Sequence, residues 1–287
     1  MGRPRRKAGR AAGAARPRGR RARDAGLAGA GARRSGRGYT SPVTDIEKRI
    51  EEGRARLLAR FGEKMRRTPS LSDPEPMGSG RRNRHGMPRV PPEQKVFESW
   101  PVLDLGEQPV IPPEKWELRV EGAVEEPLRL RWDDLLALPQ VEDQSDFHCV
   151  TGFSRLDMTW KGVRFETVAA LARPTFEATH VMVHASDGYS TNLPLEEALK
   201  PDVLLAHAVD GAPLPGEHGG PVRMVTPQLY AWKGAKWVSR LELMTHDRRG
   251  YWEIRGYSNT AWPWRNDRNR CAPGGARRPE APCFFLV

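Results

Sequence analysis

Only one of the chain's three cysteines, Cys149, lies in its interior, within the stretch DFHCVTGFSRLDMTWKGV at 146–163. A cysteine there can be a small buried apolar side chain, a nucleophile or a metal ligand. A nucleophilic thiol needs a base, and the neighbouring His148 is poorly placed in a strand because adjacent side chains point to opposite faces. The other two, Cys271 and Cys283, form no CxxC pair, so the cysteines indicate neither a disulfide framework nor a zinc knuckle. The residues alone leave the three roles of Cys149 open.

A second candidate site is the segment EHGGPVRMVTPQLYAWKGAKW at 217–237, which combines basic side chains with glycines and aromatic rings. Glycine lets the backbone approach a ligand closely. Arginine and lysine beside backbone N–H groups form an anion-binding cradle, and the aromatic side chains could wall a flat heterocycle. The alternative is a strand–turn–strand unit with a solvated basic edge, and composition favours neither reading.

The remaining histidines carry less information. His180 and His184 in HVMVH share one face of a predicted strand, but the sequence shows no carboxylate or cysteine nearby, so we expect cross-strand surface residues. His207 lies in an apolar strand and is expected to be a hydrogen-bonded core histidine.

The elements that would position these residues are mostly short strands. Alternating or β-branched runs predict strands at 116–122, 128–132, 179–186, 203–209, 220–227, 237–246 and 251–257. Helical patterns are shorter, at 132–139 and 164–174, each ended by proline. Residues 187–199 predict a turn, a short strand and a helix. We therefore expect an α+β domain dominated by sheet, with short helices.

The net charge of +11 belongs to the N-terminal end of the chain. Residues 1–43 hold 13 Arg or Lys and one acidic residue, which leaves a net charge of −1 for residues 44–287. This Arg/Ala/Gly-rich tail has too few large apolar residues to form a core, so we expect it to be disordered. The positive charge of this tail supports one non-enzymatic alternative, a nucleic-acid-binding protein whose tail contacts phosphate groups.

The composition predicts four regions. They are the disordered tail at 1–43, an amphipathic helix and extended linker at 44–95, a globular domain at 96–268 and an unstructured extension at 269–287. Thr44 and Glu47 have capping-box spacing at the start of the helix expected over 44–65. No signal peptide and no run of membrane-spanning length is recognisable, so we expect a cytoplasmic protein.

Several stretches together, among them FHCVTGFSRLD, HGGPVRMVTPQLYAWKGAKWV and YWEIRGYSN, resemble the sulfite-oxidase-like molybdopterin oxidoreductases over about residues 96–265. The resemblance implies their molybdopterin-binding fold and a mononuclear molybdenum held by one molybdopterin and one protein cysteine. It makes Cys149 the catalytic residue and the metal ligand. The cofactor-binding residues that it implies are His218, Arg223, Gly234, Ala235, Lys236 and, from a weaker match at PVLDLG, Leu103 and Asp104. The loop around Ala185 is also expected to approach the cofactor.

The subfamily is indicated by the residues after the cysteine. Sulfite oxidases have a basic run there, whereas this chain has VTGFSR with Phe153 in its place, which resembles the bacterial methionine sulfoxide reductase catalytic subunit more closely. The implied reaction is oxygen-atom transfer on a small sulfoxide, sulfite or N-oxide type compound. No flavin, NAD or haem motif is present, so a separate redox partner protein, with haem or another carrier, must exchange electrons with the site. A cysteine-dependent hydrolase is the second enzymatic alternative.

Overall fold

The computed structural model describes residues 42–66 and 75–269, with side chains from Asp45 onward. Apart from Pro42, Val43 and Asn269, the tail expected over 1–43 and the extension expected over 269–287 lie outside these ranges. The helix expected over 44–65 is α1 (Pro42–Arg66). Among the described residues, no helix has both the length and the apolar character needed to cross a membrane.

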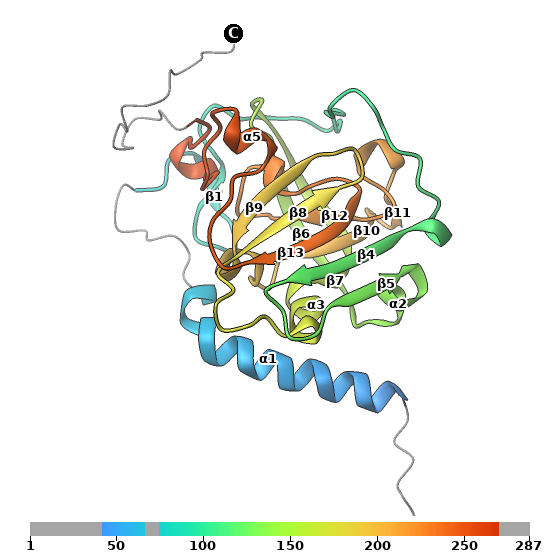
Figure 1. Ribbon diagram of the computed structural model, residues 1–287. Coiled ribbons are helices and arrows are strands. Elements are labelled where there is room, and N and C mark those ends of the chain that lie inside the picture. Colours follow the sequence, from blue (N-terminus) through green and yellow to red (C-terminus); the bar gives the residue numbers. More distant parts are fainter. Residues whose placement is uncertain (1–41, 67–74, 270–287) are drawn as a thin grey trace, which may run out of the picture. The chain divides into compact units, whose positions relative to one another are not determined.

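Two sheets form the body of the protein (Figure 1). The first has six strands: β3 (Lys95–Val96), β6 (Gln140–His148), β7 (Phe153–Arg164), β10 (Leu204–Val209), β11 (Ala212–Pro213) and β12 (Arg223–Val225). The second has five: β4 (Glu117–Gly122), β5 (Leu128–Arg131), β8 (His180–Ala185), β9 (Ser190–Pro194) and β13 (Val238–Met244). Their order is β5-β4-β13-β8-β9 in the second sheet, where β4 and β13 run parallel and the other neighbours antiparallel.

The helices are short apart from α1. They are α2 (Trp132–Ala137), α3 (Phe165–Ala172), α4 (Leu195–Ala198) and α5 (Tyr251–Ile254), with 3-10 turns η1 (Pro113–Lys115), η2 (Gly216–His218), η3 (Ala231–Lys233) and η4 (Pro263–Arg265). All eight residues of α3 are buried, and α1 packs against it (Figure 1).

One apolar core joins the two sheets. Val183 and Leu241 face each other across β8 and β13, and both belong to the same buried cluster as Val163 of β7 and Leu205 of β10. Burying both sheets on a common apolar layer stabilises the fold through the hydrophobic effect. The prediction of a sheet-rich α+β domain with short helices is confirmed.

Two local predictions were wrong. Where a strand was expected over 251–257, residues 251–254 form α5 and a turn follows at 255–256. The helical turn directs Glu253 inward to accept hydrogen bonds from Thr191 Oγ1 (2.9 Å) and Trp232 Nε1 (3.1 Å). A short stretch such as YWEIRGY, in which aromatic and charged residues mix, does not by itself distinguish a strand from a helical turn.

The second difference lies in the expected linker. Part of it forms the hairpin of β1 (Ser79–Arg82) and β2 (Pro88–Val90), and Lys95 begins β3 beside β7. The hairpin is fastened to β6 by ion pairs of Arg84 with Asp143 (2.6 Å) and Arg89 with Asp146 (2.9 Å). A stretch rich in glycine and proline is compatible with either an extended linker or a tight hairpin. The hairpin forms here because ion pairs with residues of β6, far away in the sequence, stabilise it.

Candidate functional site

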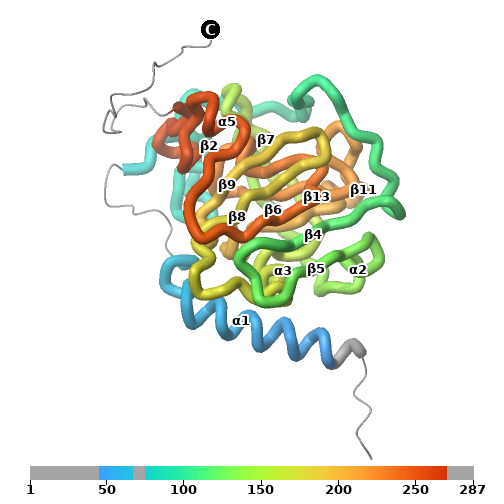
Figure 2. Tube along the Cα trace, in the orientation of Figure 1, coloured from blue at the N-terminus to red at the C-terminus, as the bar shows by residue number. Residues whose placement is uncertain are grey.

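Cys149 lies in the tight turn between β6 and β7, which Figure 2 shows next to α5. Its backbone N–H donates to the Phe153 carbonyl (2.8 Å), and its own carbonyl accepts from Gly152 N–H (3.1 Å). Gly152 has a φ of 98°, a left-handed conformation that strains residues with a Cβ. The sequence CVTG thus forms a closed turn that holds the thiol in one place.

Two segments fix this turn from outside through three hydrogen bonds. Gln94 Nε2 donates to the Cys149 carbonyl (3.0 Å), Lys95 N–H donates to the Gly152 carbonyl (2.9 Å), and Arg268 donates from Nη1 to the Val150 carbonyl. Contacts from both β3 and the C-terminal end of the described chain therefore hold the position of Cys149.

The thiol of Cys149 has no neighbouring base in hydrogen-bond contact among the described residues. Cys149 is 6 % exposed, and burial raises the pKa of its thiol, against a hydrogen bond with Thr151 Oγ1 (3.2 Å) and the charges of Arg268 and Arg223. His148 points away, bonding Ser154 Oγ through Nδ1 (2.8 Å), and burial lowers its pKa to about 4. No base is hydrogen-bonded to Cys149 within the described residues, so the arrangement argues against a cysteine hydrolase.

A metal at Cys149 would also lack further protein ligands. Within residues 42–66 and 75–269, no group of three or more His, Cys, Asp or Glu side chains could hold a metal ion. A metal bound by Cys149 must therefore receive its other ligands from a cofactor.

Arg223 on β12 is a buried cation beside this turn. Its exposed fraction is 4 %, and its Nη atoms donate to the carbonyls of His218 (2.9 Å) and Gly234 (3.1 Å). Burial lowers the pKa of Arg223 to about 10, opposed by the negative charge that Cys149 can carry. No carboxylate of the described chain lies within ion-pair distance of it. A buried, uncompensated cation is costly, so this site favours binding an anion.

Aromatic rings surround the Arg223 guanidinium. Its carbon lies 5.5, 5.3 and 5.7 Å from the ring centres of Trp100, Phe147 and Trp160. The Trp100 indole stacks on the His218 imidazole at 3.6 Å between ring centres, with planes 2° apart. The alternative of a solvated basic edge for 217–237 was therefore wrong, because the sheet and these rings enclose Arg223.

Lys236 supplies the second cation of the cradle. Its Nζ donates to the Glu217 carbonyl (2.7 Å), and burial, together with the charge of Arg223, lowers the pKa of Lys236 to about 8. Gly219 has a φ of 106°, and a Cβ there would lie 2.8 Å from Lys236 Cα, so only glycine fits beside this lysine. Burial, followed by the charges of Arg223, Lys236 and Arg155, lowers the pKa of His218 to about 4, which leaves its imidazole neutral at pH 7.

The backbone of the predicted cradle is ordered by the sheet. The Ala235 carbonyl accepts from Met224 N–H (2.9 Å), and Gly234 N–H donates to the Ala231 carbonyl (3.0 Å). These bonds place Gly234 and Ala235 directly beside β12 and its Arg223.

The N-terminal loop reaches the same region through Asp104. The carboxylate of Asp104 accepts from Gln108 Nε2 (2.6 Å) and Gly106 N–H (2.9 Å); these bonds lower its pKa, and so does the charge of Lys236. The neighbouring Leu103 is half exposed. Asp187, in the loop after Ala185, is also within reach of the Lys236 charge, although burial raises its pKa. The Asp104 carboxylate is thus close enough to Lys236 of the cradle for their charges to interact.

Sequence reasoning did not single out three residues of the site. The first is Tyr257, whose pKa is raised by burial and by the negative charge that Cys149 can carry. Arg268 and Trp100 lie outside the stretches that resemble the family's motifs, so no local signal marked them. Tyr257 lies in the quoted stretch YWEIRGYSN and could have been found there.

His184 is a cross-strand residue, as expected, but it has a carboxylate neighbour that the sequence did not show. His184 Nε2 lies 2.9 Å from Glu242 Oε2 on β13, so a carboxylate is close after all, although 58 positions away in sequence. His207 is hydrogen-bonded as expected, with its Nε2 2.9 Å from Gln140 Oε1.

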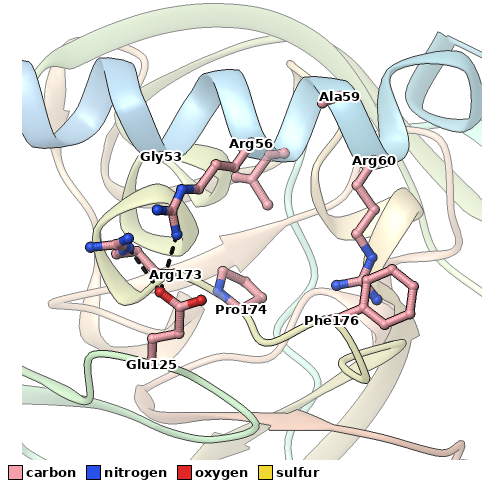
Figure 3. Close-up of a pocket in the computed structure, with 9 residues that line it drawn as sticks. Gly53, Arg56, Ala59, Arg60, Glu125, Arg173, Pro174 and Phe176 are labelled. Atoms are coloured by element: carbon pink, nitrogen blue, oxygen red, sulfur yellow. Dashed lines mark hydrogen bonds and ion pairs between the residues drawn. The ribbon is translucent and has the colours of Figure 1, made fainter.

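A cleft of about 620 Å³ lies elsewhere, between α1 and the turn after α3 (Figure 3). Glu125 pairs there with Arg56 (3.1 Å) and Arg173 (3.0 Å), which offsets much of the positive charge. None of the eight predicted site residues lines this cleft, so it is separate from the candidate active site.

Comparison with known proteins gives a consistent result. Residues 105–252 match the sequence family described as oxidoreductase molybdopterin binding domain. The chain is 45% identical over 181 residues to the uncharacterized oxidoreductase YuiH of Bacillus subtilis, across 63% of this chain and 91% of that protein.

More distant relatives have named activities. Identity is 32% over 158 residues to the protein-methionine-sulfoxide reductase catalytic subunit MsrP of Gluconobacter oxydans, across 49% of this chain and 50% of MsrP. It is 30% over 179 residues to human mitochondrial sulfite oxidase, across 52% of this chain and 33% of that enzyme. The chain thus spans half or less of either enzyme. The sulfane dehydrogenase SoxCD of Paracoccus pantotrophus matches with a TM-score of 0.45 and 23% identity, across 48% of this chain and 40% of that one.

Proposed function

Since the chain belongs to the family of oxidoreductases with a molybdopterin-binding domain, we propose that it reduces a small sulfoxide or N-oxide by oxygen-atom transfer at a molybdenum centre bound to Cys149. The observation that carries this proposal is the pairing of a lone buried thiol with a buried cation that has no carboxylate partner among the described residues. A metal cofactor that brings its own sulfur ligands and a phosphate matches both features.

The residues of the site fit such a cofactor. Cys149 would supply the protein ligand, and Arg223 with Lys236 would bind the pterin phosphate through charge-assisted hydrogen bonds. When bound, the cofactor supplies a metal that changes oxidation state by two electrons and exchanges an oxygen atom. The turn at 149–152 and the aromatic rings around Arg223 then fix its orientation and exclude water.

The surroundings of Cys149 favour a neutral substrate. The residues after it, Val150 to Phe153, carry no charge, and Phe97 lies against Phe153 at 6.1 Å between ring centres. Both arginines whose charge reaches Cys149 already donate to backbone carbonyls. A sulfoxide or N-oxide needs a hydrogen-bond donor for its oxygen and an apolar wall for its substituents. Tyr257, whose phenol hydroxyl is protonated at neutral pH as in any tyrosine, would supply such a donor.

The overall reaction breaks the bond between sulfur, or nitrogen, and oxygen. Two electrons and two protons convert the sulfoxide to the sulfide, and the oxygen leaves as water. The electrons must come from a separate donor, because the sequence contains no flavin, NAD or haem motif.

Sulfite oxidation is the second candidate. It is favoured by the charges of Arg223 and Arg268, which reach Cys149 and would attract an anionic substrate.

The test is an assay of protein purified from a host that makes molybdopterin. We expect molybdenum near one per chain, and oxidation of reduced benzyl viologen when methionine sulfoxide or trimethylamine N-oxide is added. Cys149→Ser should abolish this turnover, and Cys271→Ser serves as the control that removes another thiol. Metal-free protein would contradict the proposal, and sulfite-dependent reduction of ferricyanide without sulfoxide reduction would favour the second candidate.

A further inference from the structure

The outer face of α5 presents apolar side chains next to the candidate site. Ile254 is 60 % exposed, and Tyr251 and Trp252 are partly exposed. Large apolar and aromatic side chains on a surface are the residue types that anchor protein partners. Together with Arg249 and Arg255 we name these residues the α5 patch.

The α5 patch is positively charged. Arg249 and Arg255 are exposed, and no carboxylate of the described chain lies within ion-pair distance of either. Glu253 of the same helix turns inward and pairs with Lys233 at 2.7 Å, and neither side chain is more than 1 % exposed. The acid that opens this stretch, Asp247, is hydrogen-bonded by Asn192 (2.5 Å) and Asn259 (2.6 Å). Glu253 is therefore absent from the surface, and the two exposed arginines outnumber the one exposed acid of this stretch, Asp247.

A row of touching rings connects the α5 patch to the site. Tyr251 and Trp252 lie 5.1 Å apart between ring centres, and Trp252 and Tyr257 lie 5.0 Å apart. Trp252, Tyr257 and Val150, which directly follows Cys149, all pack against one buried cluster of Tyr230, Trp232 and Ala261. Figures 1 and 2 show α5 beside the turn between β6 and β7 that carries Cys149. A partner seated on α5 would thus approach the redox centre over a short, packed path, and electron tunnelling is fast only over short distances.

We propose that the α5 patch is the docking face for a small electron-carrier protein with an acidic surface, of the flavodoxin type. This inference rests on the proposed function, which needs two electrons per substrate molecule. Two reduced carriers would dock in turn, and each would lose one electron. Ile254 and Trp252 provide the apolar anchor, and Arg249 and Arg255 steer the acidic partner by charge complementarity.

A second group of exposed apolar side chains, at residues 96–103, fits this role less well. Val96, Phe97, Val102 and Leu103 are exposed, but Glu98, Asp104 and Glu107 lie among them, and Leu103 and Asp104 belong to the predicted cofactor loop. That stretch would repel an acidic carrier.

The experiment compares two electron donors to the loaded enzyme, with methionine sulfoxide as the acceptor. Reduced flavodoxin needs a docking face, whereas the reduced methyl viologen cation does not. The variants are the charge reversal Arg249→Glu/Arg255→Glu and the apolar change Ile254→Ser. Two controls change exposed residues away from α5. Arg119→Glu reverses a charge on β4, and the strands β13 and β8 lie between β4 and β9, which contacts α5. Phe176→Ser removes an apolar side chain that is 85 % exposed near α1.

We expect the charge reversal to lower kcat/KM for flavodoxin by about tenfold or more at low salt and to remove most of its salt dependence. Ile254→Ser should raise the KM for flavodoxin several-fold. The viologen-driven rate should stay within about twofold in both variants, and the controls should behave as wild type with both donors.

Three results would overturn the assignment. They are unchanged flavodoxin kinetics in the variants, equal losses with both donors, and a faster reaction with the basic carrier cytochrome c that the charge reversal leaves unaffected. Failure of the proposed function is distinguishable, because wild type would then show no viologen-driven sulfoxide reduction. In that case calorimetric binding of oxidised flavodoxin still decides the docking question. Wild type should bind, and the charge reversal should raise Kd about tenfold; absence of binding to wild type contradicts the proposal.

Discussion

Lys236→Met is expected to stabilise the cofactor-free protein at neutral pH while weakening its hold on the cofactor. In the cofactor-free protein the Lys236 ammonium lies partly buried beside the Arg223 guanidinium, with no carboxylate of the described chain within ion-pair distance. Methionine has a similar length and no charge. The substitution removes the free-energy cost of burying this charge. It also removes the hydrogen bond from Lys236 Nζ to the Glu217 carbonyl.

The magnitude can be worked out from the lowered pKa. Burial and the charge of Arg223 bring the pKa of Lys236 from 10.5 to about 8. At about 1.4 kcal/mol per unit this is a cost of about 3 kcal/mol. Solvent reaches part of the side chain and screens the charge, so we expect about 1–2 kcal/mol of gained stability. For a domain of this size that is a rise in melting temperature of roughly 2–8 °C.

The gain should depend on pH in a defined direction. Below pH 8 the lysine is protonated in both the folded and the unfolded state, so the whole cost is present. Between about pH 8 and 10.5 the unfolded state binds more protons than the folded state, so wild-type stability rises with pH. The advantage of Lys236→Met should therefore shrink across this window and vanish above it.

Urea unfolding of both proteins, made in a host without molybdopterin synthesis, measures this difference at pH 7 and pH 10.5. Lys236→Arg is the matched control, since it keeps a charge at both pH values and should show no such window. A Lys236→Met protein that is less stable than wild type at pH 7, or a difference that does not change with pH, would refute the electrostatic reasoning. In loaded protein the same substitution should lower pterin retention about tenfold.

Three further predictions use the same protein. Arg223→Gln removes the buried cation of the cradle and should reduce pterin content on gel filtration about tenfold or more; full retention would show that Arg223 does not bind the phosphate. Glu253→Gln leaves Lys233 buried without its partner charge and should cost about 3 kcal/mol or more in urea unfolding, whereas a loss below about 1 kcal/mol would show that the pair is dispensable. Removal of residues 1–41 should leave the melting temperature and the cofactor content unchanged, and release of the pterin on truncation would contradict the composition argument.

Much of the fold could be predicted because the strands carry clear periodic patterns. The run THVMVHAS at 179–186 is rich in β-branched residues, as strands are, and its residues 180–185 form β8. The α5 turn was missed because its conformation depends on Glu253 reaching Trp232, 21 positions away, which a local pattern does not contain. The β1–β2 hairpin depends in the same way on Asp143 and Asp146 in another strand.

The site could be predicted where one stretch of sequence holds several of its parts. His218, Arg223 and Lys236 lie within 19 residues of each other, so their combination was visible before the fold was known. Arg268 and Trp100 reach the site from opposite ends of the domain, and only the folded chain brings them to Val150 and His218. The cytoplasmic location, the substrate and the roles of the predicted site residues stay predictions.

The most direct test of the central claim is X-ray absorption at the molybdenum edge of loaded wild-type and Cys149→Ser protein. If Cys149 is the protein ligand, both proteins should contain pterin, and the variant should show one sulfur neighbour fewer around molybdenum, with turnover abolished. The variant should keep its fold, because the dithiolene and the contacts of Arg223 do not involve this sulfur. An unchanged sulfur shell, or full activity in Cys149→Ser, would contradict the assignment of Cys149 and the function proposed from it.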